Sequence, residues 1–331
     1  MIATTLEELE RAAALVHTLI APTPQYAWPK LRARAGCEVW VKHENHTPTG
    51  AFKVRGGLVY LDRLQREQPR VRGVVTATRG NHGQSIAYSA ARLAVPATIY
   101  VPFGNSPDQN TAMRDWGATV IEHGADFDAA KHEADRVAAE SGLHFVPSFH
   151  RDLVLGVASY ALEFLRAVRE LDTVYVGVGM GSGICGLILV RDLLELPTRI
   201  VGVSSRNAPA YARSFASRQV VNTASARTFA DGIATREPDA AAVELICRGA
   251  DRFVELEEAE IAAAMRAYFD DTHQLAEGAG AAPLAALLRE GPAVAGRRVG
   301  VIMTGGNIER ARYLEVLRGG TPAPPGAAPP Q

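Results

Sequence analysis

The sequence predicts an α/β protein with two lobes, each built on a mainly parallel, twisted sheet that helices cover. Short runs rich in β-branched residues alternate with longer stretches of helical spacing, which is typical of βα units. The 331 residues are 47% hydrophobic and 21% charged, so the chain can bury a large core. We expect a large lobe of residues 1–46 and 150–317, a small lobe of residues 47–149, and a disordered tail rich in Pro and Gly at residues 318–331.

The predicted elements follow one another in a regular order along the chain. An amphipathic helix is expected within residues 1–20. Strands are expected at residues 38–42, 73–77, 97–101, 119–122, 173–178, 199–203, 252–256 and 299–303. Helices are expected at residues 85–93, 126–140, 154–171, 240–248 and 257–270. Ligands of such sheets bind beyond the carboxyl ends of the strands, so residues that follow a strand are the first functional candidates.

Composition excludes several classes of protein. The net charge is -1 and arginines are scattered singly, so the chain lacks the basic stripe that nucleic acid requires. Cys37, Cys185 and Cys247 lie far apart without CxxC spacing, which argues against disulfides and a zinc site. The sequence has neither a signal-peptide pattern nor an apolar run long enough to cross a membrane. We therefore expect a cytoplasmic protein with a small-molecule ligand, no nucleic-acid partner and no membrane partner.

Lys53 is the first candidate for chemistry, because only four of the 35 basic residues are lysines. Arginine suffices for ion pairing, but only lysine can lose its proton and form an imine. Gly50 and Ala51 let a ligand approach the backbone, and Phe52 favours the neutral amine. The pattern points to a Schiff-base lysine. The alternative is a lysine on the first turn of an amphipathic helix, whose buried face is formed by Leu58, Leu61 and Leu64.

A polar, glycine-punctuated loop follows the strand at residues 73–77. It contains Thr78, Arg79, Gly80, Asn81 and His82, and a helix is expected to begin near Ser85. Converging N–H groups at a helix start bind anions, so a substrate carboxylate suits this loop, and the Asn81 amide suits a phenolic oxygen of a cofactor. The alternative is an ordinary capped turn whose polar side chains face solvent.

A second glycine loop follows the strand at residues 173–178 and precedes an apolar helix. Its residues are Gly179, Met180, Gly181, Ser182 and Gly183. Backbone amides at a helix start bind phosphate. Residues 181–186 also match the dinucleotide pattern GxGxxG, but the next strand ends in Ser204, Ser205 and Arg206, without the acidic residue that holds a ribose. A loop that binds a single phosphate group is therefore favoured over a dinucleotide site. Arg206 keeps the alternative of a dinucleotide with a phosphorylated ribose open.

Two further residues could face the ring of a cofactor. Thr304 follows the last strand and carries a hydroxyl that suits a ring nitrogen, or it caps a helix at residues 308–317. Glu277 either faces the ring or caps a helix that runs through Leu288.

These motifs together resemble the fold-type-II pyridoxal 5′-phosphate (PLP) enzymes, which have a tryptophan synthase β-like fold, and among them the serine/threonine dehydratase family. The resemblance extends to about Leu317 and depends on the order of the motifs. The motifs are Lys53 with its neighbours, residues 80–84, 179–183, 230–234, 277–281 and 304–307. The resemblance implies that Lys53 forms the Schiff base, that Asn81 contacts the phenolic oxygen, that residues 179–183 hold the phosphate, and that Thr304 contacts the pyridine nitrogen.

The chain departs from its relatives at several positions, among them Met180 and Ser182, where relatives often have glycine in the phosphate loop. Racemising relatives use a serine as a second acid/base where this chain has Arg79, so racemisation by that route is not expected. Arg79 either faces a second substrate carboxylate, stacks on an aromatic substituent, or points to solvent. Relatives that bind a divalent cation have a glutamate where this chain has Arg227, so the sequence leaves a metal site open.

The resemblance implies β-elimination from a β-hydroxy amino acid such as threonine or serine, giving a 2-oxo acid and ammonia in amino-acid catabolism. Lys53 would remove the α-proton, and the large lobe would bind the cofactor. β-Replacement on the same cofactor, a dinucleotide-dependent dehydrogenase and a ligand-binding protein without turnover remain alternatives. A homodimer is expected because relatives commonly form one.

Overall fold

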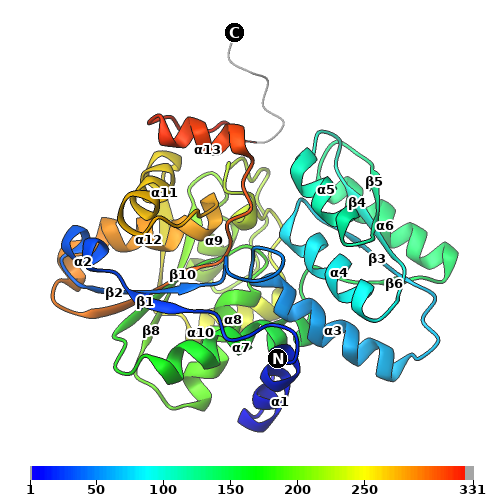
Figure 1. Ribbon diagram of the computed structural model, residues 1–331, viewed down its shortest axis with the longest axis horizontal. Helices are drawn as coiled ribbons and strands as arrows, with labels where there is room; N and C mark the ends of the chain where they lie inside the picture. Colours follow the sequence, from blue (N-terminus) through cyan, green and yellow to red (C-terminus); the bar gives the residue numbers. More distant parts are fainter. Residues whose placement is uncertain (1, 325–331) are drawn as a thin grey trace.

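Two separate sheets organise the chain, and the computed structural model describes residues 2–324. In Figure 1 the larger sheet lies on the left and the smaller sheet on the right, with helices around both. The expected α/β class with mainly parallel, helix-covered sheets is confirmed. Residues 325–331 of the expected disordered tail lie outside the described residues.

The larger sheet has six strands in the order β1-β2-β10-β7-β8-β9. Its strands are β1 (Gln25–Ala27), β2 (Glu38–His43), β7 (Thr173–Gly177), β8 (Arg199–Ser205), β9 (Arg252–Leu256) and β10 (Arg298–Met303). All neighbours pair in parallel except β1 and β2, which are antiparallel. The parallel strands therefore place their carboxyl ends along one edge of the sheet.

The smaller sheet has four parallel strands in the order β5-β4-β3-β6. Its strands are β3 (Val74–Ala77), β4 (Ala97–Val101), β5 (Thr119–Glu122) and β6 (His144–Phe145). The side chains of β3 are buried on both faces, as expected for a parallel strand between helices.

Helices cover both sheets. They are α1 (Leu6–His17), α2 (Pro29–Ala35), α3 (Lys53–Glu67), α4 (Asn81–Arg92), α5 (Pro107–Asp115), α6 (Phe127–Ser141), α7 (Arg151–Ala167), α8 (Ser182–Leu193), α9 (Ala210–Ser217), α10 (Ala240–Gly249), α11 (Glu258–Thr272), α12 (Gly278–Glu290) and α13 (Arg310–Leu317), with short 3₁₀ helices η1 (Asp231–Ile233) and η2 (Gly291–Val294). Helix α13 lies at the upper left in Figure 1, next to α11.

The eight expected strands are present, with ends shifted by two residues at most. β1 and β6 were not predicted, because two or three residues are too few for an alternation to be recognised. α2, α5 and α9 were not predicted either. The helix expected from Ser85 begins one turn earlier, at Asn81, so polar residues assigned to a loop occupy its first turn. Sequence patterns locate the interior of an element better than its ends.

Helix α3 packs against both α4 and α7, and small residues make these contacts possible. A Cβ atom on Gly156 of α7 would lie 2.2 Å from the carbonyl oxygen of Arg55 on α3. Only glycine permits such an approach of two backbones. Because α3 contacts helices of both sheets, the lobe boundaries near residues 46 and 149 stay a prediction.

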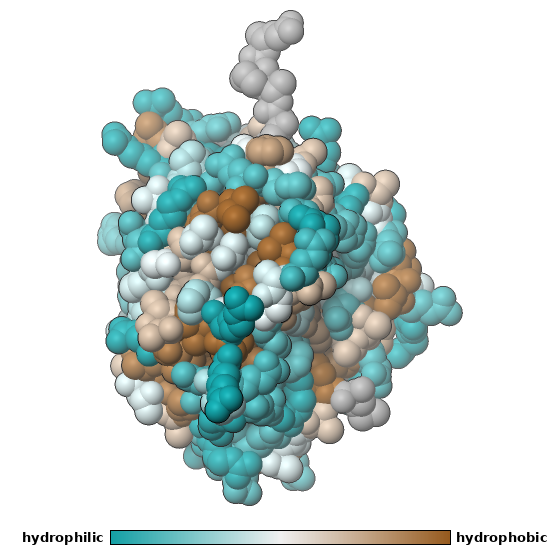
Figure 2. All heavy atoms as spheres, turned by 90° about the vertical axis from the view of Figure 1, so that its right-hand side faces the viewer, coloured by the Kyte–Doolittle hydropathy of each residue, from teal (hydrophilic) through white to brown (hydrophobic). Residues whose placement is uncertain are grey.

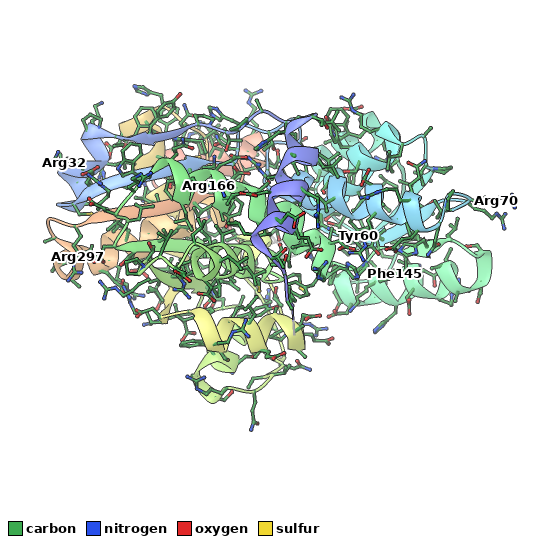
Figure 3. All side chains as sticks on the ribbon, turned by 90° about the horizontal axis from the view of Figure 1, so that it is seen from below. Arg32, Tyr60, Arg70, Phe145, Arg166 and Arg297 are labelled. Atoms are coloured by element: carbon green, nitrogen blue, oxygen red, sulfur yellow. The ribbon has the colours of Figure 1, made fainter. Side chains whose placement is uncertain are left out.

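The surface is mixed in character. Figure 2 faces the end of the molecule with the smaller sheet, where hydrophilic residues surround separate apolar patches. In Figure 3 Arg32 and Arg297 lie at one end and Arg70 at the other, so these arginines are spread over the molecule. No helix within residues 2–324 has both the length and the apolar character that a bilayer span requires.

Candidate active site

A cavity of about 450 Å³ lies where loops from both sheets meet. Three loops that follow the carboxyl ends of β3, β7 and β10 contribute to its lining, together with the start of α3 and the start of α12. The lining includes all the predicted site residues: Lys53, Thr78, Arg79, Gly80, Asn81, His82, Gly179, Met180, Gly181, Ser182, Gly183, Glu277 and Thr304. Residues as far apart in the sequence as Lys53 and Thr304 thus share one cavity at the strand ends.

Lys53 is the first residue of the amphipathic helix α3, and its amine reaches the cavity, so its position there does not exclude the Schiff-base role, which stays a prediction. Leu58, Leu61 and Leu64 form the buried face of that helix, as expected. The Lys53 Nζ atom lies 3.0 Å from Ser182 Oγ and 5.1 Å from the centre of the Phe52 ring. Burial lowers the pKa of the amine from 10.5 to about 8, so a substantial fraction is neutral near physiological pH.

The loop after β3 is held by Thr78. Its hydroxyl accepts hydrogen bonds from the backbone N–H groups of Gly80, at 3.0 Å, and Gly83, at 3.2 Å. Asn81 and His82 then lie in the first turn of α4, where backbone N–H groups have no intrahelical acceptor. The loop faces the cavity, which is not the solvent-exposed turn that was the alternative.

Asn81 belongs to a hydrogen-bonded chain that crosses the cavity wall. Its Nδ2 donates to Glu277 Oε1 at 2.8 Å, and its Oδ1 accepts from Asn307 Nδ2 at 2.7 Å. Asn307 Nδ2 also donates to the carbonyl oxygen of Thr49 at 2.7 Å, just before the lysine motif. Asn307 therefore fixes the amide of Asn81. Sequence analysis quoted Asn307 within a motif but gave it no role; its place after β10 was the available signal.

Glu277 occupies the N-cap position of α12 but makes no side-chain cap, so its carboxyl group turns to Asn81. Burial raises the pKa of this carboxyl from 4.5 to about 8, although the hydrogen bond from Asn81 opposes the shift. The group is therefore largely protonated and neutral at pH 7.

His82 is neutral, and its tautomer follows from its partner. The Thr76 hydroxyl donates to the carbonyl oxygen of Val146 at 2.7 Å, so its oxygen must accept the proton of His82 Nε2 at 3.1 Å. Burial, and then the charge of Lys53, lower the pKa of His82 to about 3. The Nδ1 atom of His82 is left as an acceptor.

The loop after β7 forms a cradle of backbone donors in front of α8. Within residues 2–324, no acceptor takes a hydrogen bond from the N–H groups of Gly179, Met180 and Gly181. A Cβ atom on Gly179 would lie 2.1 Å from the carbonyl oxygen of Gly232, so only glycine fits there. Unpaired N–H groups at the start of a twelve-residue helix suit a phosphate.

Thr304 follows β10 and is buried beside the lysine motif. Its carbonyl oxygen accepts a hydrogen bond from the Phe52 N–H at 3.0 Å, and its hydroxyl has no partner among the described residues. Thr304 does not cap the last helix, because α13 begins at Arg310 with Glu309 in the N-cap position. An unpaired hydroxyl that lines the cavity, a backbone cradle and a lysine with a lowered pKa fit the ring nitrogen, phosphate and aldehyde of PLP.

Charged groups lie on facing walls of the cavity. Asp231 begins η1, is accessible through the cavity and has a pKa raised to about 6 by burial, against the charges of Arg79 and Arg312. Arg312 lies 3.4 Å from Glu309, with which it forms an ion pair. Sequence analysis gave Asp231 and Arg312 no role, since nothing local in the sequence places them opposite Arg79.

Neither a metal site nor a dinucleotide site has structural support. Among residues 2–324, no three His, Cys, Asp or Glu side chains are grouped as metal ligands. Arg206, which left an opening for a phosphorylated ribose, forms an ion pair with Glu257 on the exposed surface.

Known proteins are similar to this chain in sequence and in fold. The family model described as pyridoxal-phosphate dependent enzyme matches residues 16–305. The L-threonine ammonia-lyase of Geobacter sulfurreducens is 37% identical over 278 residues, which are 83% of this chain and 69% of that protein. An L-threo-3-hydroxyaspartate ammonia-lyase from a Pseudomonas species is 31% identical over 310 residues, 93% of this chain and 97% of that protein.

Solved structures agree with these matches. The processed form of threonine deaminase isoform 2 from Solanum lycopersicum superposes with a TM-score of 0.88 and 25% identity, covering 96% of this chain and 95% of that one. The predicted resemblance and the predicted cofactor, pyridoxal 5′-phosphate, are therefore confirmed. The chain belongs to the pyridoxal-phosphate-dependent enzyme family.

Proposed function

We propose that the protein is an ammonia-lyase that removes water and ammonia from a β-hydroxy amino acid such as threonine or serine. The observation that carries this proposal is the Lys53 amine, with its pKa lowered to about 8, in one cavity with a phosphate cradle and an unpaired hydroxyl. The activities of two relatives, an L-threonine ammonia-lyase and an L-threo-3-hydroxyaspartate ammonia-lyase, support the same reaction.

The residues have separate roles in this proposal. Lys53 holds the cofactor covalently, residues 179–183 bind its phosphate, and Thr304 faces its ring nitrogen. When bound, PLP supplies an electron sink that makes the α-proton of an amino acid removable. Asn81 donates to the phenolic oxygen, and its amide is already oriented by Asn307 and Glu277.

Substrate binding is assigned to the start of α4. The backbone N–H groups of Asn81 and His82 lie at a helix N-terminus, where a carboxylate is favoured. Thr78 and Gly80 keep this turn in place, and His82 offers a neutral acceptor beside it.

Proton transfer is assigned to Lys53. Once the substrate's amino group has displaced Lys53 from the cofactor, the freed Lys53 amine takes the α-proton. The bond from the β-carbon to the hydroxyl oxygen then breaks while that oxygen takes up a proton, so that one water leaves. The remaining enamine takes up water, giving a 2-oxo acid and ammonia. The role of Lys53 as base requires the neutral amine, which the lowered pKa supplies at physiological pH. A dimer and a cytoplasmic location stay predictions.

Product analysis tests the proposal. Purified protein is incubated with threonine or serine alone, and ammonia and 2-oxo acid are measured. Equal amounts of both products, without a second substrate, are expected; a requirement for a second substrate would indicate β-replacement. Binding of a nicotinamide cofactor by colourless protein would instead support the dehydrogenase, and colour without turnover a binding protein.

Labelling tests the assigned lysine. Borohydride reduction followed by peptide mapping is expected to place the cofactor on Lys53. The absorption band at the visible edge should disappear in Lys53→Ala and persist in the control Lys131→Ala, a lysine of α6 outside the cavity lining. A label on another lysine would refute the assignment.

A further inference from the structure

Arg79 is a cavity cation without a partner. It lies between Thr78 and Gly80, whose mutual hydrogen bond fixes the backbone on either side. No group within residues 2–324 forms a hydrogen bond or a close ion pair with its guanidinium. Some arginine side chains of this protein, such as Arg55, Arg136 and Arg252, contact carboxylates, whereas Arg79 lines a cavity without one. An unpaired guanidinium inside a cavity is therefore available for a ligand anion.

The other positive charges of the cavity lining are already assigned or paired. Its lining contains three Lys or Arg side chains within the described residues, namely Lys53, Arg79 and Arg312. Lys53 is assigned to the cofactor, and Arg312 is paired with Glu309 at 3.4 Å. Backbone N–H groups, not cations, form the phosphate cradle and the start of α4. Arg79 is thus the cation left for an anion that neither cofactor phosphate nor α-carboxylate accounts for.

We propose that the cavity selects β-hydroxy amino acids whose side chain ends in a second carboxylate, such as 3-hydroxyaspartate, and that Arg79 binds this carboxylate. The inference rests on the proposed function, since it assigns the substrate class of the same site. A guanidinium presents two parallel N–H donors to a carboxylate, which fixes the orientation of the substrate as well as attracting it. The methyl group of threonine offers no hydrogen-bond acceptor to these N–H donors.

Asp231 faces the same space and would compete with the substrate for Arg79. It is beyond ion-pair distance of Arg79, yet its carboxyl responds to the charges of Arg79 and Arg312. The pKa of Asp231 is raised to about 6, and an incoming carboxylate favours its protonated form further.

Kinetics on a substrate series tests the proposal. We compare kcat/KM for 3-hydroxyaspartate, threonine and phenylserine in wild type, Arg79→Met, Arg79→Lys and the control Arg312→Met. Wild type should prefer 3-hydroxyaspartate. Arg79→Met should lose roughly 10- to 100-fold on 3-hydroxyaspartate alone, the range for a charge-assisted hydrogen-bonded pair, and Arg79→Lys should lose less. Arg312→Met should keep the wild-type preference, because its charge is already paired.

Binding without turnover provides an independent test. Calorimetry of the holoenzyme with succinate and with butyrate compares a dicarboxylate with a monocarboxylate of the same length. Succinate should bind at least about tenfold more tightly to wild type, and Arg79→Met should abolish this difference. The visible absorption of each variant verifies that cofactor is bound before either measurement.

Each contrary result has a definite meaning. Equal losses on all three substrates would overturn the proposal and place Arg79 on the α-carboxylate. A loss confined to phenylserine would overturn it in favour of stacking, and unchanged preference would leave Arg79 facing solvent. If no amino acid is deaminated, the proposed function fails, while the succinate comparison still decides whether Arg79 binds a second carboxylate.

Discussion

Two groups of charged residues, each with one member on helix α3, differ in whether their charges are paired. In the first group, Arg55 of α3 forms a buried cluster with Lys42, Glu44 and Glu163, in which the two positive and two negative charges balance. In the second group, Lys53 of α3 and Arg79 line the cavity and have no carboxylate partner within the described residues. Lys53 and Arg55 are two positions apart on one helix.

The buried cluster is fully hydrogen-bonded. Arg55 Nε lies 2.7 Å from Glu44 Oε2, Arg55 Nη1 lies 2.6 Å from Glu163 Oε1 and 2.9 Å from Ser159 Oγ, and Lys42 Nζ lies 2.5 Å from Glu163 Oε2. Arg55 and Glu44 have no exposed side-chain surface. Burial disfavours the charge of Arg55, but the carboxylates of Glu44 and Glu163 outweigh it and raise the pKa.

The comparison separates charges that hold the fold from charges that can react. A buried ion pair with good partners keeps its ordinary protonation state, so it ties α3 to β2 and α7 at all physiological pH values. A buried titratable group without a counter-charge shifts toward its neutral form, as the pKa values of Lys53 and Glu277 show. Such groups exchange protons near pH 7, which acid–base catalysis requires.

Removal of Lys53 should have the largest effect on activity and little effect on the fold. Lys53→Ala should lower the rate of ammonia release roughly 10⁴-fold or more, because both the covalent anchor and the base are lost. The unfolding free energy of the cofactor-free protein should not fall, since the amine is desolvated and makes one side-chain hydrogen bond. Steady-state kinetics and urea unfolding measure the two quantities. A large loss of stability would contradict the comparison.

Removal of Arg55 should have a large effect on the stability of the fold. Arg55→Met leaves two buried carboxylates facing Lys42 alone, and an uncompensated buried charge costs about 3–5 kcal/mol of unfolding free energy. Urea unfolding measures this cost. The control Arg63→Met lies on the same helix with 43% of its side chain exposed, and should cost about 1 kcal/mol at most. Adding Glu163→Gln to Arg55→Met should restore part of the stability; no recovery would argue against a charge effect.

The contrast explains what the sequence could predict. Motif residues follow strands that have clear patterns, so the cavity could be assembled from strand ends without coordinates. Arg55 lies three residues before Leu58 on the apolar face of α3, so its burial could also have been predicted. Its partners could not, because Glu44 and Glu163 are 11 and 108 positions away and their pairing depends on tertiary packing.

Sequence patterns did not predict the exact ends of helices or the effects of partners that lie far away in the sequence. The start of α4 at Asn81 was missed because Gly80, Asn81 and His82 have turn composition, although Thr78 closes the turn before them. The shifted pKa of Glu277 depends on burial beneath Asn81, 196 positions away, which no periodicity reports.

Glu277 should make stability depend on pH. Its pKa is about 8 in the folded state against 4.5 ordinarily, so between these values the folded state holds a proton that the unfolded state releases. The unfolding free energy of cofactor-free protein should therefore fall by as much as a few kcal/mol as the pH rises from 4.5 to 8. Glu277→Gln, which is neutral throughout, should flatten the curve. Glu140→Gln, an exposed residue of α6, should follow wild type. Parallel curves for wild type and Glu277→Gln would show that Glu277 is ionised in the fold.

Asn307 should give the smallest effect, because it acts on the cavity through Asn81. Asn307→Ala removes the hydrogen bonds to Asn81 Oδ1 and to the Thr49 carbonyl, so the Asn81 amide is no longer fixed by two partners. A loss of about 1.4 kcal/mol, or roughly tenfold weaker binding of PLP, is expected from two neutral hydrogen bonds. Fluorescence titration of cofactor-free protein measures it, with the exposed Asn222→Ala as control. An unchanged affinity for PLP would mean that Glu277 alone orients Asn81. The hydrogen bonds of Asn307 would then contribute nothing to cofactor binding.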